Sequence, residues 1–120
     1  MSVRKVLCVD DVRADLTNLE KIVSSANYLV ATAASGEEAV AKALAEKPDL
    51  IFMDVNMAGM DGFAATRELK KNADTKGIPV VFVTAKNQKA DRVWAQMQGG
   101  SGFVSKPYTA DEIMQQLKAF

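Results

Sequence analysis

The order of apolar and polar residues alternates between two kinds of segment along the chain. Short continuous apolar runs, typical of strands buried on both faces, lie at residues 6–9, 50–53 and 80–83. Between such runs, apolar residues recur every three or four positions, which is the period of a helix with one buried side. We predict strands at residues 6–9, 28–33, 50–54, 80–83 and 103–105, the fourth ending at Thr84.

Each predicted strand is followed by a predicted helix. Ser35 and Thr109 each stand three residues before a glutamate, a spacing that forms a capping box at a helix start. The second helix ends before Pro48, and the third runs over about residues 63–71. The predicted inner stripes are Val12, Leu16, Leu19 and Val23, then Ala39, Val40, Ala43 and Leu44, and finally Ile113, Leu117 and Phe120. The fourth helix is predicted to present Ala90, Val93, Trp94 and Met97 on one face. Trp94 and Met97 are expected to pack in the core or against a partner.

The alternation of five strands with five helices favours an α/β fold with a doubly wound parallel sheet. Parallel neighbours require crossover connections, and helices on both faces of the sheet supply them. For five strands the common order is 2-1-3-4-5, the flavodoxin-like (βα)5 arrangement. The sequence contains no repeat or linker, so we expect residues 1–120 to form a single domain without an output module.

The composition narrows the classes of partner and chemistry. Lysine plus arginine and aspartate plus glutamate number 15 each, which leaves no global field to attract nucleic acid or an acidic membrane. We therefore expect proteins or small anions as partners. We also expect a cytoplasmic location, because no apolar stretch reaches the length of a signal or a membrane span. Cys8 lies in a predicted strand and is expected to be a buried small hydrophobe.

The chain contains no histidine. This absence excludes histidine-ligated metals, Ser-His-Asp catalysis and a role as a phosphohistidine carrier. The chemistry of the protein must therefore depend on carboxylates, hydroxyls and lysines.

Residues that can carry such chemistry stand at the carboxyl ends of four predicted strands. Asp10 and Asp11 follow the first strand, Asp54 ends the third, Thr84 ends the fourth and Lys106 follows the fifth. In the order 2-1-3-4-5, the first and third strands end side by side at the point where doubly wound folds bind ligands. We therefore expect these five residues to share one crevice.

Three carboxylates in one crevice repel one another, and a hard divalent cation relieves the repulsion. Mg2+ suits this group because it binds through one or two carboxylates, waters and substrate phosphate oxygens. We expect direct contacts from Asp11, Asp54 and the backbone carbonyl of Asn56, with Asp10 acting through a water molecule.

Asp54 is the predicted nucleophile. One of its oxygens, left free of metal, can attack phosphorus in line and take the phosphoryl group as an acyl phosphate. Lys106, the Thr84 hydroxyl and backbone amides near Ala85 are expected to hold the other phosphoryl oxygens. Water can hydrolyse the product, so we expect a timed switch. Asn56 and Lys86 flank the expected water approach and should tune its lifetime.

The spaced motifs resemble the receiver domain of two-component response regulators, the CheY-like family. They are Asp10-Asp11, Asp54 with Val55-Asn56-Met57-x-Gly59, Thr84-Ala85, Phe103 and Lys106-Pro107, and they cover nearly the whole chain. The resemblance implies that a histidine kinase phosphorylates Asp54. The other implied roles are metal binding by Asp10, Asp11 and Asn56, a switch formed by Thr84 and Phe103, phosphate binding by Lys106, and a cis bond between Lys106 and Pro107.

The resemblance also implies an output. Phosphorylation would change the face made by the fourth helix, the fifth strand and the fifth helix, and with it the affinity for a protein target. A phosphate sink that drains a shared kinase is equally compatible. We expect no enzyme activity beyond phosphorylation and dephosphorylation of the chain itself, and a monomer or weak dimer.

Two positions depart from the family pattern. Ala58 stands where proline is common, so the loop after Asp54 is expected to be looser. Phe103 stands where tyrosine is common and can signal only through burial or exposure of its ring. Residues 89–94 and the following Gln98-Gly99-Gly100 resemble single-domain regulators of type IV pilus twitching motility.

Two other protein classes share part of this chemistry. Phosphatases of the haloacid dehalogenase type combine an aspartate nucleophile with Mg2+, but they place it after the first strand in Asp-x-Asp and carry a substrate cap. A flavodoxin-like FMN carrier requires a hydroxyl-rich phosphate loop where Asp10 and Asp11 stand. Taken alone, Asp10-Asp11 also fits a solvated helix cap, Thr84 an ordinary strand end and Lys106 a solvated surface amine. The joint placement at four strand ends favours the receiver.

Overall fold

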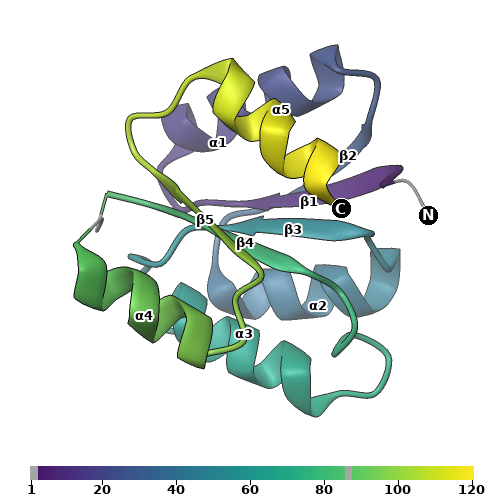
Figure 1. Ribbon diagram of the computed structural model, residues 1–120. Helices are drawn as coiled ribbons and strands as arrows, with labels where there is room; N and C mark the ends of the chain where they lie inside the picture. The colour runs from purple at the N-terminus through teal and green to yellow at the C-terminus, as the bar shows by residue number, and fades with distance from the viewer. Residues whose placement is uncertain (1–2, 86–87) are drawn as a thin grey trace.

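In the computed structural model, which describes residues 3–85 and 88–120, five parallel strands alternate with five helices (Figure 1). The elements are β1 (Lys5–Val9), α1 (Arg13–Ser25), β2 (Leu29–Ala33), α2 (Gly36–Glu46), β3 (Leu50–Met53), α3 (Gly62–Lys71), β4 (Val80–Thr84), α4 (Lys89–Met97), β5 (Gly102–Ser105) and α5 (Ala110–Ala119). The strand order is β2-β1-β3-β4-β5. The predicted fold class and strand order are confirmed.

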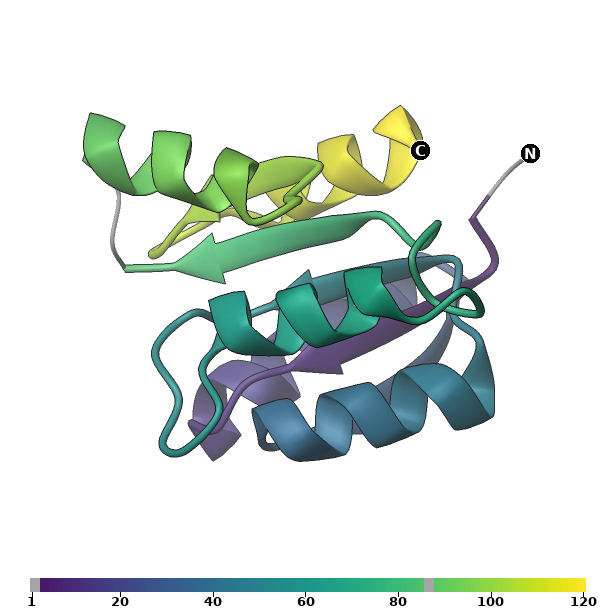
Figure 2. The same cartoon turned by 90° about the horizontal axis from the view of Figure 1, so that it is seen from below.

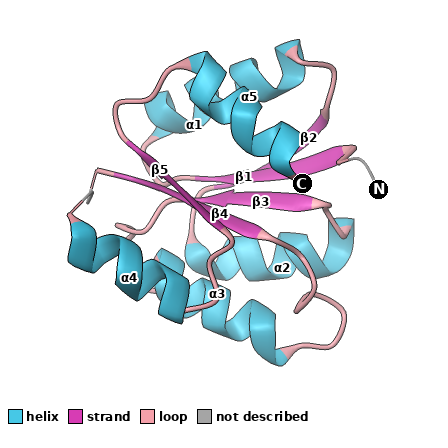
Figure 3. Cartoon of the chain, viewed as in Figure 1, coloured by secondary structure: helices cyan, strands magenta, loops and turns pink. Residues whose placement is uncertain are grey.

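Helices cover both faces of the sheet. α1 and α5 lie on one face, and α2, α3 and α4 lie on the other (Figure 3). From below, these three helices lie side by side across the sheet (Figure 2). Successive strand residues point to opposite faces, so Leu7 joins the cluster under α2, α3 and α4, and Val6 joins the cluster under α1 and α5. Strands buried on both faces explain the continuous apolar runs in the sequence.

Cys8 belongs to the cluster under α1 and α5 and is fully buried. Burial, with a smaller contribution from the charge of Glu20, raises the pKa of its thiol to about 12. A thiol in this setting stays protonated and unreactive at neutral pH. The prediction of a buried small hydrophobe is confirmed.

Two helices bury a narrower stripe than the sequence pattern predicts. Val12 stands at the N-cap of α1 and is exposed, Leu16 is partly buried, and only Leu19 and Val23 of the predicted stripe are fully buried. In α2 the large side chain of Leu44 is 36% exposed, whereas Ala43 is buried. The small residue lets the helix lie close to the sheet, and the larger neighbour is turned toward solvent.

The apolar face predicted for α4 lies on the surface. Its members Ala90, Val93, Trp94 and Met97 are all exposed. α4 instead buries Ala95, and the Trp94 ring meets that of Phe63 edge-on at a centroid distance of 6.4 Å. Of the two settings predicted for Trp94 and Met97, the core is therefore ruled out and packing against a partner stays a prediction, because helical periodicity locates an apolar face but not what covers it.

One of the two predicted capping boxes is complete, and the other is half formed. Thr109 and Glu112 form the complete capping box at α5. Ser35 accepts a hydrogen bond from the Glu38 amide, but the Glu38 carboxylate accepts from the amide of Ala34 instead of Ser35. The bond between Lys106 and Pro107 is cis, as the resemblance implied. Over the described residues, no helix has both the length and the apolar character needed to cross a bilayer.

Candidate functional site

The hydrogen-bond register brings four strand ends to one edge of the sheet. Val9 pairs with Met53, and the amide of Asp54 donates to the Val9 carbonyl at 3.0 Å. Asp10 and Asp54 therefore leave neighbouring strands at the same level. At the other side, the amide of Lys106 donates to the carbonyl of Thr84 at 2.9 Å. The predicted convergence of these ends is present.

Three carboxylates form a cluster at this edge. Asp10 and Asp54 are 3% and 5% exposed, whereas Asp11 lies at the surface. One oxygen from each lies within 4.8 Å of the others. A cluster of hard oxygen donors that is partly open to solvent could hold a divalent cation of the Mg2+ type.

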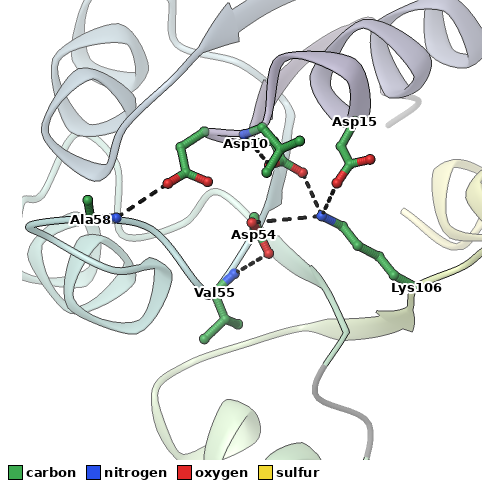
Figure 4. A network of polar contacts seen from close by, with 8 residues as sticks. Asp10, Asp15, Asp54, Val55, Ala58 and Lys106 are labelled. Carbon is green, nitrogen blue, oxygen red and sulfur yellow. Dashed lines mark hydrogen bonds and ion pairs between the residues drawn. The ribbon is translucent and has the colours of Figure 1, made fainter.

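Lys106 extends into this cluster from the end of β5 (Figure 4). Its Nζ lies 2.8 Å from Asp10 Oδ2, 2.9 Å from Asp15 Oδ2 and 3.8 Å from Asp54 Oδ2. Burial alone would lower the pKa of the amine, but the hydrogen bonds to Asp10 and Asp15 and the charge of Asp54 outweigh it and raise the pKa. Lys106 is therefore a permanent ammonium among carboxylates.

Asp15 was not anticipated from the sequence. It lies in the first turn of α1, five residues beyond Asp10, where an acidic residue also interacts favourably with the helix dipole. That common role hides the contact with Lys106, which lies 91 positions away. An acidic residue one helical turn after the Asp10-Asp11 pair is the signal that could have identified it.

Backbone amides fix the orientation of the three clustered carboxylates. Asp10 accepts from the Val12 amide at 2.9 Å, and Asp54 accepts from the Val55 amide at 2.9 Å. Asp11 accepts from the amide of Ala58 at 3.4 Å, a weak bond that spans the loops after β1 and β3. With Oδ1 bonded to Val55, Asp54 presents Oδ2 toward Lys106 (Figure 4).

Gly62 supports the loop that carries Asp54. Its amide donates to the Val55 carbonyl at 3.0 Å, and Asp61 caps α3 by accepting from the Ala64 amide at 2.8 Å. A methyl group on Gly62 would overlap the carbonyl oxygen of Asp54 and lie 2.9 Å from the Cα of Val55. Only glycine allows α3 to begin this close to Asp54.

Asp54 is an unusual carboxylate. Burial, followed by repulsion from Asp10, raises its pKa from 3.8 to about 6, although Lys106 and the Val55 amide pull the pKa in the opposite direction. In the absence of metal, the ionised form of Asp54 is therefore disfavoured in the folded protein. A bound cation would reverse this preference.

We expect Asp54→Asn to raise the free energy of unfolding of the metal-free protein by about 2 kcal/mol at pH 7.5. Because the folded pKa lies above the unfolded one, wild type loses stability as pH rises from about 4 to about 6, relative to the variant. Urea unfolding in a chelator at several pH values measures the difference, with the exposed Asp74→Asn as control. A variant less stable than wild type at pH 7.5 would contradict the expectation.

The remaining predicted residues occupy different settings. Thr84 is fully buried as the last residue of β4, and Asn56 is exposed in the loop after β3. Metal binding by the Asn56 carbonyl stays a prediction. Lys86, expected to tune the lifetime of the acyl phosphate, lies outside the described residues.

Phe103 is the second residue of β5 and is partly buried. The guanidinium of Arg92 lies over its ring, 4.8 Å from the centroid, and also donates to the Ser105 hydroxyl at 3.2 Å. Arg92 was not singled out in the sequence. Its contact from α4 fixes the ring in its present position.

Comparison with known proteins agrees with this geometry. Residues 6–118 match the family model of the response regulator receiver domain. Protein PilH of Pseudomonas aeruginosa is 37% identical over 115 residues, which cover 96% of this chain and 95% of PilH. The similarity spans nearly the full length of both chains, which agrees with the predicted resemblance to single-domain regulators.

Solved structures are similar over nearly the full chain. The chemotaxis protein CheY4 of Vibrio cholerae has a TM-score of 0.92 at 30% identity, with 98% of each chain covered. The receiver domain of a sensor histidine kinase from Pseudomonas aeruginosa has a TM-score of 0.90 at 28% identity, covering 98% of this chain and 97% of its own. That structure is described with a magnesium ion coordinated in its active site cleft.

Proposed function

The chain belongs to the response regulator receiver domain family of two-component signalling, and on that premise we propose that it is a switch phosphorylated on Asp54 by a histidine kinase. The observation that carries the proposal is the buried carboxylate of Asp54, which lies between two other acids and the Lys106 ammonium. A buried carboxylate is costly when its nearest ammonium, here Lys106, is hydrogen-bonded to Asp10 and Asp15 instead, so its retention suits a reacting group.

Asp54 Oδ2 is the nucleophile in this proposal. It forms a bond to phosphorus while the bond from phosphorus to the kinase imidazole, or to the carboxylate oxygen of a small acyl phosphate, breaks. The leaving group departs with the electron pair, and Asp54 becomes an acyl phosphate. Lys106, with the Thr84 hydroxyl and the Ala85 amide, stabilises the negative charge on the phosphoryl oxygens.

Asp10, Asp11, Asp54 and the Asn56 carbonyl would hold Mg2+. The fit rests on the chemistry of the donors, since three carboxylate oxygens lie within 4.8 Å of one another. When bound, Mg2+ would supply positive charge among these carboxylates. The similar receiver domain described with magnesium in its cleft supports this part of the proposal.

The switch works through Thr84 and Phe103. Recruitment of the Thr84 hydroxyl to the phosphoryl group leaves space behind it, into which the Phe103 ring turns. That turn breaks the contact with Arg92, so α4 and β5 change together. The exposed Val93 and Met97 on α4 support an output through binding of a protein to the α4–β5–α5 face.

The remaining parts of the proposal concern cellular context. Similarity to PilH supports a role in twitching motility, with a pilus-linked histidine kinase as phosphodonor. The output is association with a protein target, or drainage of phosphate from a shared kinase. We infer no enzyme activity beyond the chain's own phosphorylation and dephosphorylation, a cytoplasmic location, and a monomer or weak dimer.

Incubation with Mg2+ and acetyl phosphate, followed by intact-mass measurement, tests the proposal. We expect one added phosphoryl group per chain, lost in base and absent in Asp54→Asn. A wild-type protein that takes no phosphate from acetyl phosphate or from any histidine kinase would overturn it. Turnover of many phosphoester molecules per chain would instead favour the haloacid dehalogenase type of phosphatase.

A further inference from the structure

We propose that Asp15 is a positioning residue that holds Lys106 and slows the reaction of Asp54 with anionic phosphodonors. The inference rests on the proposed function of Asp54 and adds a determinant of its rate. Its basis is the contact between the Asp15 carboxylate and the Lys106 ammonium (Figure 4).

The geometry shows that Asp15 competes for the ammonium. An ammonium has three N–H donors, and in Lys106 two of them go to Asp10 at 2.8 Å and Asp15 at 2.9 Å. Asp54 Oδ2, at 3.8 Å, lies beyond hydrogen-bond distance. Asp15 therefore draws the amine away from the oxygen where the phosphoryl group must be stabilised.

Asp15 also changes the charge of the site. The three clustered carboxylates carry three negative charges, which Lys106 and one divalent cation together neutralise. Asp15 adds a negative charge that this set does not neutralise. An acyl phosphate carries negative charge at neutral pH, so it approaches a site that Asp15 makes net negative.

Asp15 lies where a donor can reach Lys106 from solvent. Its side chain is 44% exposed, whereas that of Lys106 is 18% exposed. Both line a surface hollow of about 400 Å3, together with Ala85, whose amide is expected to hold a phosphoryl oxygen. A phosphodonor that enters this hollow meets the Asp15 carboxylate beside the Lys106 ammonium.

Asp15→Asn tests the inference because it keeps the size and an oxygen that accepts from Lys106. At saturating Mg2+ and low ionic strength, the rate of phosphorylation by acetyl phosphate should rise about fivefold, as expected for removing one charge several ångströms from a dianion. Mg2+ affinity, measured by titration calorimetry, should fall by a similar factor. The gain in rate should disappear near 1 M salt.

Two control variants separate charge from structure. Asp15→Glu restores the charge and should return the rate toward that of wild type. Asp74→Asn removes an exposed charge from the loop before β4, and should change neither rate nor affinity. A merely structural role of Asp15 would slow phosphorylation in the Asn variant instead of accelerating it.

An unchanged or slower rate in Asp15→Asn, with wild type phosphorylated normally, would overturn the inference and leave the proposed function intact. If wild type accepts no phosphate, the proposed function fails, and the Mg2+ titration then decides the role of Asp15. Equal Mg2+ affinity of wild type and variant would overturn the inference in that case.

Discussion

Replacing Lys106 with methionine is expected to lower the free energy of unfolding of the metal-free protein by about 3 kcal/mol. Methionine has a similar length but no charge, so Asp10 loses a buried partner at 2.8 Å and the repulsion among the three acids is no longer offset. The raised pKa of the Lys106 amine means that the ammonium contribution is fully present at neutral pH and is lost only in strong base.

Urea unfolding in a chelator at pH 7.5 measures this effect, and Lys71→Met serves as the matched control. Lys71 pairs with Glu68 at 3.5 Å on the surface, so its loss should lower the free energy of unfolding by less than about 1 kcal/mol. Addition of Mg2+ should reduce the deficit of the Lys106 variant, because a cation among the carboxylates replaces part of the missing charge. An equal loss of unfolding free energy in the two variants would show that Lys106 contributes no more than an exposed ion pair.

Gly62→Ala is expected to cost about 3 kcal/mol of stability, at the upper end of the usual range for overpacking. The added methyl group meets the backbone of Asp54 and Val55, which cannot move aside as a flexible side chain can. To relieve the overlap, the start of α3 must shift away from β3. Because Val55 and Asp61 anchor that start, the loop after Asp54 shifts with it.

Gly77→Ala is the control for this variant. A methyl group on Gly77 meets no atom within 4 Å, and its loop joins α3 to β4 at the opposite edge of the sheet. Its free energy of unfolding should stay within about 0.5 kcal/mol of wild type. Thermal and urea unfolding measure both variants, and a Gly62 variant as stable as the Gly77 variant would contradict the close backbone contact.

The sequence was sufficient to predict the sheet and the gathering of charged residues at its edge. The apolar runs at residues 6–9 and 50–53 are long enough to identify strands but too short for helices, and parallel topology then brings Asp10 beside Asp54. The position of Lys106 followed in the same way from the end of the fifth strand. These predictions depend on the alternation of strands and helices, which hydrophobic patterning specifies, and on the common strand order of doubly wound sheets.

The contacts of individual side chains could not be predicted in this way. The Lys106 stem can point its amine in several directions, and its choice of Asp15 depends on the start and angle of α1. The same holds for Arg92, whose position over Phe103 depends on how α4 rests on the sheet. The sequence could not decide between core and surface for the apolar face of α4 for a related reason, since a solvent-facing apolar stripe has the same period as a core-facing one.

The ion pair between Asp10 and Lys106 joins positions 96 residues apart in the chain. While the chain is being synthesised, its acids can gather as soon as β1 and β3 pair, but the ammonium arrives only with β5. Under the proposed function, a nascent or truncated chain that lacks this last strand has no ammonium to stabilise the transferred phosphoryl group. The phosphate-binding site is therefore complete only after β5 has been synthesised.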